Sequence, residues 1–154
     1  MRQRRWFVPV LALALAAAML LAPLPRSWGA GWRSELLNFG HVPLFIGVVV
    51  SLWLWSRSSI VRPALLAVLL AGLAEIVQHY FDRSASFVDF LYGVCGSFAG
   101  AALIRAAIQR SWRRASAWFR LAVAFVAWPL VWSGPVLLDA VEGHRDFPVL
   151  ADFR

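Results

Sequence analysis

The chain has 154 residues, of which 61% are hydrophobic and 15% are charged, and its formal net charge is +7. Soluble domains average about 45–50% apolar and about 25% charged residues, so this composition excludes a soluble enzyme and favours an integral membrane protein. Every basic residue is an arginine, and most of these arginines stand at the ends of long apolar runs. They therefore indicate membrane topology and argue against a nucleic-acid interface.

Five apolar runs approach the roughly 20 residues that a helix needs to cross a bilayer. In chain order they cover residues 6–24, 39–55, 63–77, 86–104 and 118–132. The first run follows three arginines, as in a signal peptide, but its length and the lack of a small-residue cleavage site favour a retained helix. We therefore predict an all-α integral membrane protein, a bundle of about five transmembrane helices.

The segments between these runs predict the topology. We expect a polar connection over residues 25–38, a tight turn over 79–85 and a basic linker from Arg105 to Arg114. With the N-terminus inside and the C-terminus outside, nine arginines fall on the cytoplasmic side and five on the outer side, as the positive-inside rule favours. The expected division is a bundle over 1–132 and a polar extracytoplasmic tail over 133–154.

A few polar residues interrupt the apolar runs, and they form the candidate site. A charged residue inside a membrane helix costs about 2.5–3.5 kcal/mol on insertion scales, so each one needs a reason. His41 opens the second run, Glu75 and Gln78 end the third, and Asp89 opens the fourth. Arg83 lies on the turn between the third and fourth runs. In the predicted topology all five lie at the level of the outer leaflet.

Spacing by three and four residues places these groups on stripes of small residues. One stripe is Ala64, Ala67, Ala71, Glu75 and Gln78, and the other is Asp89, Gly93, Gly96 and Gly100. The Gly96-x-x-x-Gly100 spacing is typical of membrane helices that pack closely. We therefore expect the two stripes to pack on each other, with both carboxylates facing the bundle.

Structural roles compete with a site role for these residues. Ser86 and Asp89 match a capping box, in which Asp89 reaches back to the amide of Ser86. Glu75 could pair with Arg83 to hold the turn, and His41 could be an ordinary interfacial histidine. The sequence leaves these alternatives open.

The order of these motifs resembles the VanZ-like family of bacterial membrane proteins. The resemblance is carried by Gly40-His41-Val42-Pro43, Glu75-Ile76-Val77-Gln78, Arg83, Ser86-Phe87-Val88-Asp89 and the spaced glycines. It covers a core of about residues 38–104 and implies a bacterial inner-membrane protein connected with resistance to teicoplanin-type glycopeptides. It supplies no reaction. Many members carry an Asp-Lys pair just before the histidine, where this chain has Asn38, Phe39 and Gly40.

Three functions follow as hypotheses. The leading one is a polar pocket in the outer leaflet that engages an envelope lipid head group or an amphiphilic glycopeptide-type antibiotic, with no cofactor. Arg83 would suit an anionic group, and His41 with Glu75 could move a proton. The second is an enzyme acting on a lipid-linked envelope substrate, in which His41, Glu75 and Asp89 could hold a divalent metal, although no local ligand motif supports one. The third is a scaffold whose polar cluster only fixes helix pairing.

Overall fold

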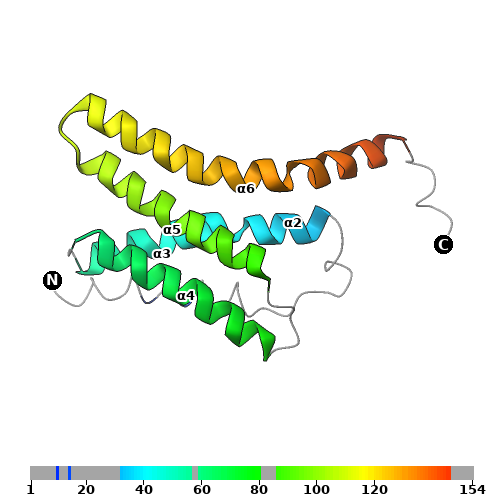
Figure 1. Cartoon of the computed structure of the whole chain (residues 1–154), viewed down its shortest axis with the longest axis horizontal. Helices are drawn as coiled ribbons and strands as arrows, with labels where there is room; N and C mark the ends of the chain where they lie inside the picture. The colour runs from blue at the N-terminus through cyan, green and yellow to red at the C-terminus, as the bar shows by residue number, and fades with distance from the viewer. Residues whose placement is uncertain (1–9, 11–13, 15–31, 57–58, 81–85, 147–154) are drawn as a thin grey trace.

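The computed structural model describes residues 10, 14, 32–56, 59–80 and 86–146, and its regular elements are all helices (Figure 1). They are α2 (Trp32–Phe39), α3 (His41–Ser56), α4 (Val61–His79), α5 (Phe87–Ile108) and α6 (Trp112–Asp146). Among the described residues, four stretches are long and apolar enough to cross a membrane: Glu35–Ser56, Val61–His79, Phe87–Ile108 and Trp112–Val136. The chain is therefore an all-helical, multi-pass membrane protein. The predicted first helix lies outside the described residues apart from positions 10 and 14, and the orientation stays a prediction.

The second membrane segment begins earlier than predicted. The polar connection expected over 25–38 is wrong in its last part, because Trp32–Phe39 forms α2. Gly40 joins α2 to α3, and its amide donates a hydrogen bond of 3.0 Å to the carbonyl oxygen of Leu36. A Cβ at position 40 would lie 2.9 Å from the carbonyl oxygen of Leu37, so the close junction needs glycine. The two helices together provide the first of the four candidate spans.

The predicted basic linker is also shorter in the structure. Arg105 belongs to α5, whereas Arg113 and Arg114 belong to α6, which leaves only residues 109–111 between the helices. α6 has 35 residues and extends beyond the predicted run at both ends. Hydropathy marks the part of a helix that suits lipid, whereas backbone hydrogen bonding decides where the helix ends, so the two lengths differ.

α5 is the central helix of the bundle. It packs against α3, α4 and α6, and α6 also lies along α2 (Figure 1). α3 and α5 begin at the end of the bundle where α4 finishes. The meeting of His41, Glu75 and Asp89 at this end shows the arrangement. α4 therefore runs antiparallel to both. The apolar core comprises Phe45, Val48, Val49, Leu52, Ile60, Ala67, Ala71 and Ile104.

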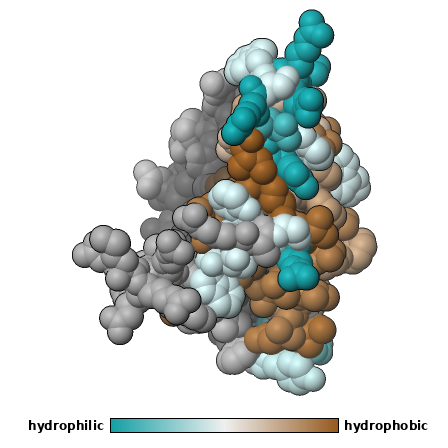
Figure 2. Space-filling model, turned by 90° about the vertical axis from the view of Figure 1, so that its left-hand side faces the viewer, coloured by the Kyte–Doolittle hydropathy of each residue, from teal (hydrophilic) through white to brown (hydrophobic). Residues whose placement is uncertain are grey.

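α4 has the polarity expected of a helix in lipid. Its buried face consists of small and polar residues, namely Pro63, Ala64, Ala67, Ala71, Glu75 and Gln78. Its large apolar residues lie on the outer face, where Leu65, Leu66, Leu69, Leu73 and Ile76 are each at least half exposed. Hydrophobic residues cover much of the coloured surface, while hydrophilic ones gather mainly at one edge (Figure 2). This arrangement is stable only if lipid covers the leucines.

The glycines of α5 pack mainly against α3 and not against α4. A Cβ at Gly96 would overlap the carbonyl oxygen of Val42, and one at Gly100 would lie 3.2 Å from the Cα of Ile46. Only Gly93 approaches the alanine stripe, since its Cβ would lie 2.8 Å from the Cβ of Ala71. The expected pairing of the two stripes therefore holds at Asp89, which meets Glu75, and at Gly93, but it is wrong for Gly96 and Gly100. The glycines bring α3 close to α5, and with it His41.

Candidate functional site

Three helix ends bring three of the candidate residues together. His41 is the first residue of α3, Glu75 lies near the end of α4, and Asp89 lies in the first turn of α5. One ligand atom from each side chain falls within 4.8 Å of the others. The side chains are only 7%, 9% and 8% exposed, in that order, so the expectation that both carboxylates face the bundle is confirmed. We call His41, Glu75 and Asp89 the polar cluster.

Of the other two candidates, the structure describes Gln78 but not Arg83. Gln78 follows Glu75 by three residues on the buried face of α4 and is 2% exposed. Arg83 lies outside the described residues, so its pairing with Glu75 stays a prediction. His79, one residue beyond Gln78, is exposed at the end of α4.

One of the two hydrogen bonds predicted for the capping box at the start of α5 is present. The hydroxyl oxygen of Ser86 accepts a hydrogen bond from the amide of Asp89 at 3.4 Å, as expected for an N-cap. The amide of Ser86, however, donates to Oε2 of Glu75 at 2.9 Å and not to Asp89. Glu75 therefore satisfies an unpaired donor at the start of α5, and it ties α4 to α5 across the turn.

His41 has one ring nitrogen paired and the other unpaired. Its Nδ1 lies 3.0 Å from the backbone carbonyl oxygen of Asn38. Because a carbonyl oxygen only accepts, Nδ1 carries the hydrogen, and in the neutral ring the lone pair is on Nε2. Nε2 is buried and has no hydrogen-bond partner among the described residues. A buried polar atom without a partner is costly, so this nitrogen calls for a ligand.

The start of α5 places partial positive charge beside the polar cluster, because the first amides of a helix carry roughly half a positive elementary charge. Asp89 lies in this first turn, and the amide of Ser86 just before it donates to Glu75. α3 adds little, since the amides of Gly40 and Leu44 donate to the carbonyl oxygens of Leu36 and Gly40 and continue the helix from α2. The two carboxylates and the imidazole offer oxygen and nitrogen atoms that can bind a cation. Imidazole and carboxylate groups together are ligands for divalent ions such as zinc or manganese.

A second buried polar chain was not predicted from the sequence. The hydroxyl of Ser133 donates to Oε2 of Glu35 at 2.9 Å. Since a serine has a single hydroxyl hydrogen, the contact of 2.6 Å between Ser133 and Tyr92 is donated by the tyrosine. These hydrogen bonds, which we call the polar chain, link α2, α5 and α6. A tyrosine inside an apolar run, three residues after Asp89, was the available signal, because a buried phenol needs a partner.

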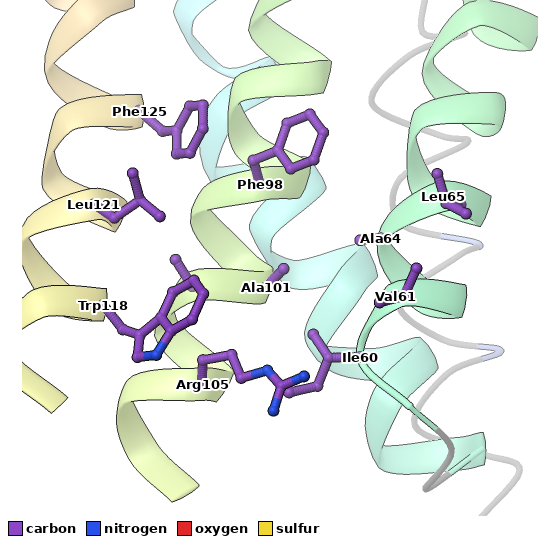
Figure 3. Close-up of a pocket in the computed structure, with 11 residues that line it drawn as sticks. Ile60, Val61, Ala64, Leu65, Phe98, Ala101, Arg105, Trp118, Leu121 and Phe125 are labelled. Carbon is purple, nitrogen blue, oxygen red and sulfur yellow. The ribbon is translucent and has the colours of Figure 1, made fainter. Parts of the chain in front are cut away.

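The structure also contains an apolar cavity of about 320 Å³ at the opposite end of α4 and α5 (Figure 3). Its walls come from α4, α5, α6 and the residue before α4, and they include Ile60, Leu65, Phe98, Trp118, Leu121 and Phe125. The phenyl rings of Phe98 and Phe125 stack with centroids 5.4 Å apart. Arg105 is the one charged residue that lines it. The cavity offers space for hydrocarbon and no group for catalysis.

Comparison with protein-family models, with curated proteins and with solved structures returned no match. The resemblance to the VanZ-like family therefore stays a prediction from the sequence motifs.

Proposed function

We propose that this chain is a VanZ-like protein of the bacterial inner membrane whose polar cluster engages the polar head of an envelope lipid or of an amphiphilic, teicoplanin-type glycopeptide. One observation carries the proposal: His41, Glu75 and Asp89 converge from three helices at one end of an apolar bundle. Ionisable residues within membrane segments are rare and usually mark a functional site. In the predicted topology this end faces the outer leaflet, where such head groups lie.

A second candidate function, an enzyme acting on a lipid-linked substrate, is favoured by the same three residues for a different reason. The unpaired Nε2 of His41 is a potential base, and a ring nitrogen of His41 lies within 4.8 Å of an oxygen of each carboxylate. A third, the scaffold, is supported by the hydrogen bond from Ser86 to Glu75, which fixes the pairing of α4 with α5.

The experiment is a teicoplanin susceptibility assay in bacteria that express the full chain. We expect Glu75→Gln and Asp89→Asn to abolish any protection while the protein level in the membrane is unchanged, because both changes remove charge with little change in shape. His79→Gln is the matched control, since this exposed histidine lies only four residues beyond Glu75. Full protection in both cluster variants would end the proposal, and loss of protein together with protection would favour the scaffold.

A further inference from the structure

We propose that His41, Glu75 and Asp89 form a binding site for one divalent metal ion of the zinc type, and that this ion contacts an anionic oxygen of the bound head group. Only the second half of this statement rests on the proposed function. The metal site itself is argued from the geometry, the hydrogen bonds and the charge of the three residues.

The three side chains are close enough to share one ion. Ligand atoms around a tetrahedral zinc lie about 2.0–2.2 Å from the metal and roughly 3.5 Å from one another. The donor atoms of the polar cluster lie within 4.8 Å of one another. Contraction by roughly one ångström, which small rotations of the two carboxylate side chains can supply, completes the geometry.

His41 already has the hydrogen bond that a metal-bound histidine needs. Such a histidine usually donates its remote ring N–H to a carbonyl or carboxylate, which fixes the ring and leaves the other nitrogen for the metal. Here Nδ1 is bonded to the carbonyl oxygen of Asn38, and Nε2 is buried without a partner. The ring also stacks on Phe45, with centroids 6.5 Å apart and an angle of 11° between the planes. The imidazole is therefore held in place before any ligand arrives.

Glu75 is held in a comparable way. Its Oε2 accepts the amide of Ser86, which orients the carboxylate, and the second oxygen can coordinate a metal. The carboxylate of Asp89 comes from the first turn of α5 and lies within 4.8 Å of the other two ligand atoms. Each of the three ligands thus comes from a different helix, and none depends on a local sequence motif. This explains why no local ligand motif in the sequence supported a metal at these residues.

Charge balance gives an independent argument. Two carboxylates that lie close together and are shielded from water repel each other, and each favours a nearby positive charge. A divalent ion neutralises both. Three protein ligands leave at least one coordination position of zinc open, as in catalytic zinc sites. That position would accept a phosphate or carboxylate oxygen, which the acidic cluster alone would repel.

The test is a zinc titration of the full chain, purified in detergent and treated with a chelator, followed by isothermal titration calorimetry. We expect one zinc ion per chain. His41→Ala and Asp89→Asn should each weaken binding by more than about 100-fold, beyond the roughly 10–100-fold effect of losing a partner outside the metal shell. His79→Ala is the matched control and should bind as the parent does.

Two results would overturn the metal site: no zinc binding by the parent chain, or equal binding by the parent and Asp89→Asn. Asp89→Asn changes almost no volume, and a circular dichroism spectrum and elution profile like those of the parent establish that it is folded. If zinc binds as expected but teicoplanin protection is absent, the metal site stands and its contact with a head group is wrong. Protection without zinc binding would overturn the metal site and leave only the engagement of the head group by the side chains themselves.

Discussion

The two ends of the α4–α5 pair differ in what they bury. At one end Glu75 and Asp89 are 9% and 8% exposed and point into the bundle with His41. At the other end the same two helices line a cavity of about 320 Å³ with apolar side chains, and Arg105 is half-buried at that end of α5. A long arginine near a helix end can extend its charge to the membrane surface, whereas short acidic side chains cannot. The two ends therefore differ in the kind of group that they bury: carboxylates and an imidazole at the first, hydrocarbon at the second.

The largest effect on this comparison is expected at Gly96, which lies on α5 between the two ends and packs closely against α3. We expect Gly96→Ala to destabilise the protein by about 1–3 kcal/mol or more, since the added methyl group would overlap the carbonyl oxygen of Val42. Gly47→Ala is the matched control, as nothing lies within 4 Å of its added methyl group. Thermal unfolding in detergent measures both. Equal stability of the two variants would contradict the close approach of α3 to α5.

The polar chain from Tyr92 to Glu35 gives an intermediate effect. Tyr92→Phe removes the donor to Ser133 and should lower stability by about 0.6–2 kcal/mol, the usual range for hydrogen bonds between membrane helices. Tyr80→Phe is the control, because Tyr80 is 80% exposed. Zinc affinity should be unchanged in both variants. If the zinc affinity falls in Tyr92→Phe, the hydrogen bonds from Tyr92 through Ser133 to Glu35 and the polar cluster act together.

The smallest effect is expected at the cavity. Ala101→Val adds a side chain that the cavity can accommodate and should change stability by less than about 0.5 kcal/mol. The same change at Ala71, which is 2% exposed and packs on Gly93, should cost about 1–3 kcal/mol. Unfolding curves of the two variants test the contrast. If Ala101→Val is the more damaging change, the cavity is filled in the folded protein.

Much of the fold was predictable because lipid imposes simple rules. The apolar runs over 63–77 and 86–104 agree with α4 and α5 to within four residues at each end. The spacing of Ala64, Ala67, Ala71, Glu75 and Gln78 identified the buried face of α4, and the cost of charge in lipid predicted that Glu75 and Asp89 would face inward.

The remaining features depend on contacts that no local pattern specifies. Glu35 and Ser133 are 98 residues apart, and each lies outside the predicted apolar runs, in a segment that was predicted to be polar. The amide of Ser86 had a plausible partner in Asp89, and only the packing of α4 on α5 shows that Glu75 takes it. The partner of the glycines was likewise undetermined, because a small residue shows that a helix approaches closely but not which helix it is.

X-ray absorption at the zinc edge of the metal-loaded full chain tests the central claim most directly. We predict nitrogen and oxygen neighbours at about 2.0–2.2 Å together with the outer scattering of one imidazole, and we predict that His41→Ala removes the imidazole signal. Sulfur among the nearest neighbours, which would implicate Cys95 or a methionine, would contradict the account. An imidazole signal that persists in His41→Ala would contradict it equally.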